Sequence, residues 1–206
     1  MQTIAFAEQN ILKVKRTMMN TYVLLMRGIN VGGKNKVPMA GLTKRLEELG
    51  FSRVLTYIAS GNVILKSDKH ADVIKAQIEE ALPESFKLDI ALIKVLVLTR
   101  NQLQTVIDNK PKDFGEQPEK YHSDVIFLMG ITLEEALPVF SPREGVDRIW
   151  PGDGVIYSQR VSAQRTESRL SKIVATPAYK SMTIRNWNTT TKLLKMIEEI
   201  DTRKGV

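Results

Sequence analysis

The stretch that decides the fold is LLMRGINVGGKNKVPM, residues 24–39. It begins inside a short apolar run, residues 21–29, which predicts a buried strand. It ends just after Pro38, which suits the first turn of a helix, and Gly50 suits the end of that helix. One face of the helix is apolar at helical spacing: Met39, Leu42, Leu46 and Leu49. The sequence therefore predicts a strand, a glycine-rich connection and a helix, in that order.

Further elements follow this helix closely. Residues 53–58 and 62–66 are two expected strands, because the intervening ASGN is typical of a hairpin turn. Residues 71–82 form an expected helix with one apolar face, ended by Pro83, and residues 88–98 form another strand. The order β-α-β-β-α-β is that of the split βαβ, or ferredoxin-like, plait.

The second half repeats this order of elements. A short helix at Arg100–Asp108, capped by Thr99, precedes residues 109–122, which have no periodicity and are interpreted as a linker. Thr132 and Glu135 have the spacing of a capping box at the start of a helix. The other expected elements are strands at 123–129, 146–150, 155–161 and 182–185, and helices ending near 140, at 168–175 and at 189–200.

The expected fold class is therefore α+β, with two tandem ferredoxin-like (α-β plait, βαββαβ) subdomains. Residues 19–98 form the first subdomain, 99–122 the connecting helix and linker, and 123–206 the second subdomain with its closing helix. Residues 1–18 precede the first strand without a complete amphipathic element. They are interpreted as an N-terminal extension, disordered or dispensable.

Composition limits the classes of function. Of 206 residues, 43% are apolar, which is enough for a sizeable core, and cysteine is absent, which excludes disulfides and thiolate chemistry. No apolar run reaches the roughly 18 residues that a membrane span needs, and we expect a cytoplasmic protein without membrane association. The net charge of +7 favours anionic partners, either small molecules or nucleic acid.

Four motifs together resemble a known family. RGINVGGKNKVPM, TYIASGNVIL, SRLSKIV and TIRNWNTTTKLLKM are similar to the bacterial domain of unknown function 1697 family, and the likeness spans nearly all of residues 19–200. The resemblance implies two α-β plait subdomains, and it implies no established activity.

The glycine-rich loop is the first candidate site. Glycines let backbone amides approach a ligand, and amides at the start of a helix favour an anion. We predict that at least one of Gly32 and Gly33 has a positive φ. The alternative is a strand-to-helix connection that needs glycine only to turn, and the spacing matches neither a P-loop nor a dinucleotide fingerprint. The candidate ligand-binding residues of this loop are Arg27, Asn30, Gly32, Gly33, Lys34 and Asn35.

The turn SGN is the second candidate. Ser60 and Asn62 are expected to donate hydrogen bonds to a ligand, because no histidine is near enough in sequence to make Ser60 a convincing nucleophile. We expect this hairpin to leave the sheet at the end opposite the glycine-rich loop. Asn62 would then reach that loop only if the hairpin bends.

The carboxy-terminal half supplies the third candidate. Residues 160–195 contain eight basic residues and a single acid, Glu167, and such segregation of charge favours a binding face. Arg185 lies just before the last helix and could offer a planar fork to a phosphate or carboxylate, although it could instead pair with Asp147 or Glu167, or stack on Trp187. The candidate ligand-binding residues of this half are Arg169, Lys172, Arg185 and Asn186.

Aromatic and metal-binding patterns are weaker. Tyr157, Tyr179 and Trp187 lie among the basic residues and could stack on a nucleobase, but core packing is the favoured interpretation for Trp187. His70 and His122 have no histidine partner at ligand spacing, so neither a metal nor a cofactor is expected.

Three functions stay open at this point. The first is binding of a phosphate-bearing or other anionic small ligand between the two subdomains. The second is RNA or DNA binding by the basic carboxy-terminal face, which would weaken steeply with salt. The third is a phosphoryl or acyl-phosphate hydrolase, which rests on analogy of fold.

Overall fold

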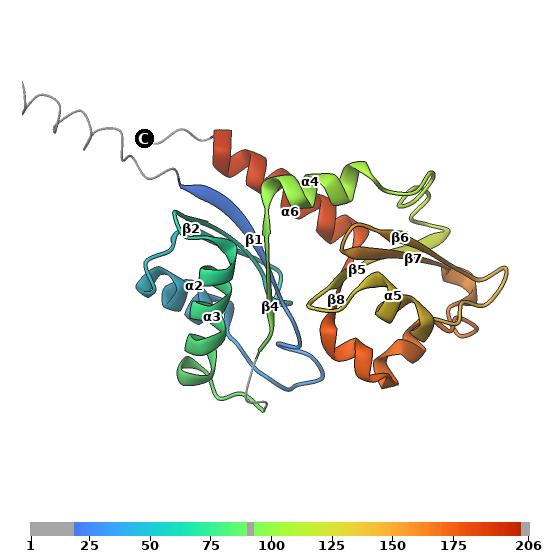
Figure 1. The fold of residues 1–206 in the computed structure, drawn as a ribbon, viewed down its shortest axis with the longest axis horizontal. Helices are drawn as coiled ribbons and strands as arrows, with labels where there is room; N and C mark the ends of the chain where they lie inside the picture. Colours follow the sequence, from blue (N-terminus) through green and yellow to red (C-terminus); the bar gives the residue numbers. More distant parts are fainter. Residues whose placement is uncertain (1–18, 90–92, 203–206) are drawn as a thin grey trace, which may run out of the picture.

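The computed structural model describes residues 19–89 and 93–202 (Figure 1). The expected N-terminal extension, residues 1–18, lies outside the described residues. Within them the protein is a mixed α+β structure with two four-stranded antiparallel sheets.

The first sheet is built from the first half of the chain. Its strand order is β2-β3-β1-β4, so β4 lies at one edge and β1 in the interior. The elements are β1 (Asn20–Met26), α2 (Met39–Glu48), β2 (Ser52–Tyr57), β3 (Asn62–Ser67), α3 (Ala71–Ser85) and β4 (Val95–Thr99). Both helices cover the same face of this sheet (Figure 1).

The second sheet has the matching order β6-β7-β5-β8, with β8 at one edge. Its strands are β5 (Tyr121–Leu128), β6 (Asp147–Gly152), β7 (Val155–Val161) and β8 (Met182–Asn186). The helices of this half are α4 (Arg100–Asp108), α5 (Leu133–Ala136) and α6 (Trp187–Thr202), with 3₁₀ turns η1 (Leu137–Val139), η2 (Ser162–Gln164), η3 (Leu170–Ala175) and η4 (Pro177–Ser181).

Three apolar layers hold these elements together. The first lies between the first sheet and helices α2 and α3, and the third covers the outer face of the second sheet. The second layer is shared by both halves, because side chains of both sheets and of α4 and α6 pack in it. Strand β1 is apolar throughout because both of its faces are buried: Leu24 faces the first layer, whereas Val23 and Leu25 face the second.

The stretch interpreted as a linker contributes to the shared layer. Phe114 is fully buried, and its ring makes edge-on contacts with three aromatic rings, those of Trp150, Tyr157 and Trp187. The Tyr157 hydroxyl donates to the Val106 carbonyl over 2.6 Å, and burial raises the pKa of Tyr157 to about 12. The packing role expected for Trp187 is confirmed.

Several expected elements differ in the structure. Helix α3 continues past Pro83 to Ser85, because a proline in the last turn removes only one helical N–H. Strand β4 begins at Val95 and not at residue 88. The expected helix at 168–175 is the 3₁₀ turn η3, and the closing helix begins at Trp187 and not at residue 189. The predicted N-cap at Thr99 and the predicted capping box at Thr132 are confirmed, and Thr99 also forms a capping box, with Gln102.

Candidate functional site

The glycine-rich loop is wound by residues in the left-handed region. Gly32 and Gly33 have φ values of +59° and +79°, which confirms the prediction for this pair. Asn30 and Asn35 also have positive φ, at +54° and +48°. Asparagine tolerates this region better than most residues because its short side chain can hydrogen-bond nearby backbone groups.

Both asparagines use their side chains within the protein. Asn30 donates to the carbonyls of Val37 and Ala59 and accepts from the Val37 amide, all within 2.9 Å. Asn35 is buried, donates to the Gly28 carbonyl over 2.9 Å and exchanges hydrogen bonds with Asp89. These two candidates therefore hold the loop in shape, while Gly32, Gly33 and Lys34 are exposed at its tip.

The expectation that the 59–62 hairpin lies at the opposite end of the sheet is wrong. Strands β1 and β3 are antiparallel neighbours, and Leu25, near the end of β1, pairs with Asn62 at the start of β3. The start of one antiparallel strand lies beside the end of its partner. The Met26 amide accordingly donates to the Gly61 carbonyl over 2.8 Å. The hairpin reaches the loop without bending.

Arg185 lies at the junction of the two sheets. It is 7% exposed, and its five N–H donors all have acceptors. Nε donates to Asn62 Oδ1, and Nη2 donates to the Met26 and Ser60 carbonyls at 2.9 and 3.0 Å. Nη1 donates to Thr183 Oγ1 and the Ile184 carbonyl. No carboxylate of a described residue pairs with this guanidinium, and burial lowers the pKa of Arg185 to about 10.

Arg27 makes a second link between the sheets. Its Nε donates to the carbonyls of Tyr179 and Met182 at 3.2 and 3.1 Å, and its guanidinium lies 5.0 Å from the centre of the Tyr179 ring. The structure thus brings together four predicted site residues as a joint between the halves: Arg27, Ser60, Asn62 and Arg185.

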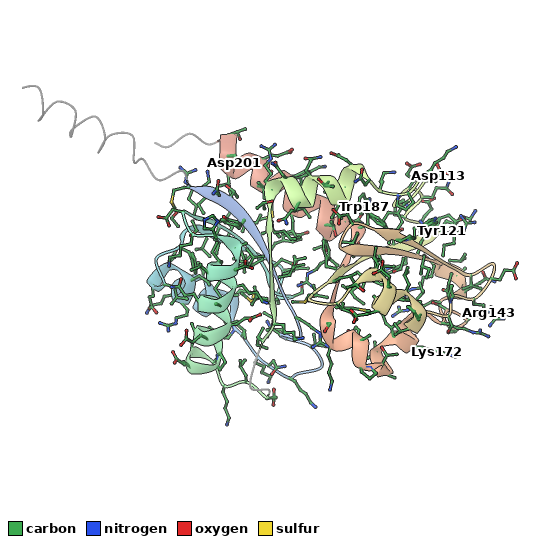
Figure 2. The ribbon with its side chains drawn as sticks, in the orientation of Figure 1. Asp113, Tyr121, Arg143, Lys172, Trp187 and Asp201 are labelled. Carbon is green, nitrogen blue, oxygen red and sulfur yellow. The ribbon has the colours of Figure 1, made fainter. Side chains whose placement is uncertain are left out.

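The other carboxy-terminal candidates lie elsewhere. Lys172 is exposed at the outer end of the second half, away from the first sheet (Figure 2). Arg169 is also exposed, and its amide donates to Asp147 over 2.8 Å. Asn186 donates to the Ser123 carbonyl and accepts from the Asn188 amide, which shapes the start of α6.

Asp147 anchors the segment that carries Arg169. The carboxylate is buried, and one of its oxygens accepts from the amides of both Arg143 and Arg169. Burial alone would raise the pKa of Asp147, but these two hydrogen bonds, a bond with Ser168 and the charge of Arg160 outweigh it and lower the pKa.

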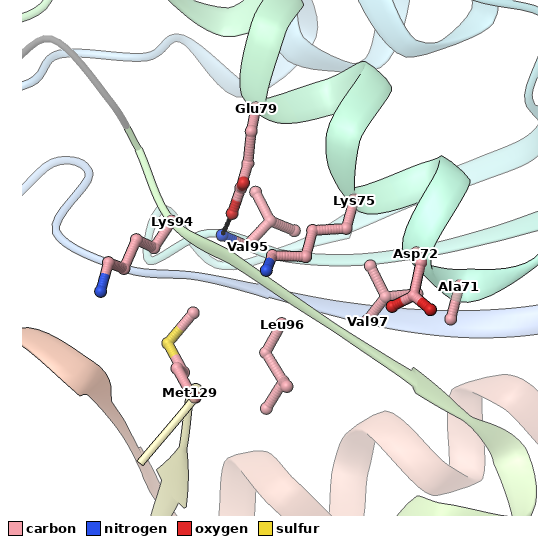
Figure 3. Close-up of a pocket in the computed structure, with 10 residues that line it drawn as sticks. Ala71, Asp72, Lys75, Glu79, Lys94, Val95, Leu96, Val97 and Met129 are labelled. Carbon is pink, nitrogen blue, oxygen red and sulfur yellow. Dashed lines mark hydrogen bonds between the residues drawn. The ribbon is translucent and has the colours of Figure 1, made fainter.

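A cleft of about 320 Å³ lies at the edge of β4, between the two halves. Helix α3 contributes Lys75, β4 contributes Leu96, the residue just before β4 is Lys94, and the segment after β5 contributes Met129. In Figure 3, Lys75 extends from α3 on one side of β4, whereas the side chains of Lys94, Leu96 and Met129 lie on the other side of the strand. In the described part of the chain, neither lysine ammonium lies within ion-pair distance of a carboxylate.

The ladder with β1 decides which backbone groups of β4 face the cleft. Arg27 donates its amide N–H to the Lys94 carbonyl over 2.9 Å. Bonded pairs alternate along an antiparallel ladder, so the N–H and C=O groups of Val95, Val97 and Thr99 point away from β1. The outer two of these three amides donate to side chains. The Val95 amide donates to Glu79 Oε1 over 2.7 Å, and the Thr99 amide donates to Gln102 Oε1 over 2.9 Å.

Sequence reasoning missed Lys75, Glu79 and Lys94. One signal was present, because Asp72, Lys75 and Glu79 recur at helical spacing on the polar face of α3. The second signal, a lysine that interrupts the apolar run before β4, was interpreted as part of the strand. Only the order of strands in the sheet shows that this lysine lies at an open edge.

The described residues form neither a helix suited to a membrane nor a metal-binding cluster. Across residues 19–89 and 93–202, none of the helices combines the length and apolar character that a membrane crossing requires. The same residues contain no group of three or more histidine, cysteine, aspartate or glutamate side chains placed to hold a metal ion.

The fold thus defines a two-sheet α+β protein whose halves share an apolar layer, with a cleft at the edge of β4. Comparison with known proteins gives its family. The model of the family described as "Protein of unknown function (DUF1697)" matches residues 19–157, and the chain belongs to this family. No curated protein sequence matches the chain.

Among solved structures, the chain is similar to the conserved bacterial protein SP0830 from Streptococcus pneumoniae. The two share 26% sequence identity with a TM-score of 0.74. The match covers 87% of this chain and 99% of the other.

Proposed function

We propose that the protein binds a small anionic ligand in the cleft beside β4, between its two halves. The observation that carries this proposal is the pair of lysines, Lys75 and Lys94, at a cleft of about 320 Å³ without carboxylate partners among the described residues. A cleft of this size suits a small molecule, and an apolar floor with a few convergent polar groups is typical of ligand sites.

We also infer that each half is a ferredoxin-like plait. The first half supports this with the element order β-α-β-β-α-β and the strand order β2-β3-β1-β4. The second half has the same strand order, and the segment between β7 and β8 is built from 3₁₀ turns where a plait has its second helix. In this arrangement the fourth strand of the first plait is an edge strand that faces the second plait.

Two observations favour this site over the others considered from the sequence. Asn30, Asn35, Asn62 and Arg185 already use their side chains to bond the protein itself. Tyr157 and Trp187, which were considered as stacking partners for bases in a nucleic-acid complex, are 1% and 8% exposed. A nucleic-acid face would need aromatic rings at the surface.

A titration of the full chain tests the proposal. Inorganic phosphate, succinate and glycerol 3-phosphate are added separately, and backbone amide resonances of residues 94–97 and 129–130 report binding. We expect saturable shifts at these residues with at least one probe. Lys75→Met and Lys94→Met should each weaken that binding about tenfold, the scale of one charge-assisted hydrogen bond.

Lys195→Met is the matched control, because Lys195 is exposed on α6, outside the cleft. It should leave affinity unchanged. Shifts that appear only in the loop at residues 27–37, or that are insensitive to both cleft lysines, would place the anion site elsewhere.

A further inference from the structure

The open edge of β4 carries backbone groups that a small inorganic anion would not use. The Val97 amide lies between two amides occupied by side chains, those of Val95 and Thr99. No side chain of a described residue accepts from the Val97 amide. Its N–H and C=O both point to the open edge, which is the pattern an incoming strand uses.

Charge is divided along this edge. Figure 3 shows Asp72 beside Val97, whereas Lys75 and Lys94 lie near Val95. A ligand that runs along the edge therefore meets an acid at one end and two cations at the other. A peptide antiparallel to β4 runs from the Val97 end toward the Val95 end, which brings its carboxyl terminus to the lysines.

Glu79 marks where that carboxyl terminus would sit. Its carboxylate already accepts from the Val95 amide at 2.7 Å, and Lys75, four residues earlier on the same helix, lines the same cleft. The site thus holds a carboxylate of the protein itself on the first outward-pointing amide of the edge.

We propose that the ligand of this cleft is an extended peptide with a free carboxyl terminus, which adds to the edge of β4 as an antiparallel strand. This inference rests on the proposed anion site and names its ligand. The terminal carboxylate replaces Glu79 on the Val95 amide, between Lys75 and Lys94. The residue two positions before the terminus exchanges two backbone hydrogen bonds with Val97.

The register makes backbone methylation a sharp test. The residue two positions before the terminus directs its N–H to the Val97 carbonyl, whereas the residue one position before directs its N–H away from β4. N-methylation at the first position should abolish binding. N-methylation at the second position adds the same group and should be tolerated.

The experiment begins with immobilised full-length protein and two pools of synthetic tetrapeptides. Both pools are acetylated and randomised at all four positions, and one ends in a carboxylate, the other in a carboxamide. We expect retention of the carboxylate pool only. A retained peptide is then resynthesised for titration, where the carboxamide form and Lys94→Met should each bind at least tenfold more weakly.

Two further readouts separate strand addition from simple charge attraction. Glu79→Gln should bind the peptide more tightly than the wild type, because it removes the competing charge, and the Val97 amide should exchange more slowly with solvent in the complex. Lys195→Met should change neither affinity nor exchange. Equal or absent retention of both pools overturns the inference, and so does equal tolerance of the two N-methyl peptides.

The experiments distinguish failure of the peptide inference from failure of the anion site. If phosphate, succinate or glycerol 3-phosphate binds in a Lys75- and Lys94-dependent way while neither peptide pool is retained, the anion site stands and the peptide inference is wrong. If no small anion and no peptide binds, both are wrong.

Discussion

Arg185 is the residue whose role differs most from the one its sequence position indicates. A guanidinium just before a helix predicts a ligand-binding fork, yet its five donors are all directed at acceptors within the protein. Neither Asp147 nor Glu167 is its partner. The sequence could not reveal this, because Met26, Ser60 and Asn62 are distant in the chain and become neighbours only through sheet pairing.

Removal of this side chain should destabilise the fold. Arg185→Ala leaves several buried acceptors without a donor, and we expect the free energy of unfolding to fall by about 3 kcal/mol, as for other buried charged groups that lose their partners. Urea unfolding measures the change. Arg165→Ala, at an exposed position, is the control and should stay within about 0.5 kcal/mol. A stable Arg185→Ala protein that loses anion binding would return Arg185 to the ligand site.

Asp147 should make stability depend on pH in the acid range. Its pKa is lowered in the folded protein, so its contribution is complete above the unfolded value near 3.8 and is lost as the pH falls through the folded value. Asp147→Asn should therefore lose stability at pH 7 and show a flatter decline below about pH 4. Urea unfolding at pH 7 and at pH 3 checks both points. Parallel curves for the two proteins would contradict the role.

At the scale of elements, local signals were reliable and long-range ones were not. The N-cap at Thr99, the capping box at Thr132 and the positive φ of the paired glycines follow from local sequence, and the structure contains them. The position of the 59–62 hairpin and the open edge of β4 depend on strand order, which no local pattern encodes. For the same reason, the sequence alone could not show that Lys75 and Lys94 line the same cleft.

Gly115 tests whether the stretch 109–122 is more than a connection. A Cβ at this position would lie 2.1 Å from the Trp187 ring, and φ is +77°. Gly115→Ala should therefore cost about 3 kcal/mol, because overpacking adds to backbone strain. Gly145→Ala is matched in φ, at +76°, but its Cβ would meet nothing within 4 Å, so strain alone of about 1 kcal/mol is expected. Thermal unfolding compares the two variants, and equal losses would show that the contact with Trp187 yields easily.

At the scale of the whole molecule, the shared apolar layer should make both sheets unfold together. Val23 and Leu25 of the first sheet pack in the same layer as Phe127 of the second, with Phe114 among them. Phe114→Ala should cost about 3–5 kcal/mol, the range for a fully buried ring. Hydrogen exchange in denaturant should show β1 and β5 losing protection at one concentration. Separate transitions would mean that each half folds independently.

The joint at Arg185 should withstand low pH and high salt. Its acceptors are carbonyl, amide and hydroxyl oxygens of neutral groups, so the joint has no anion that acid could protonate. Mobile ions screen attraction between opposite charges, and here there is no such attraction to screen. Low pH or a high salt concentration should therefore leave the two sheets connected at this point, even where acid has released the segment held by Asp147.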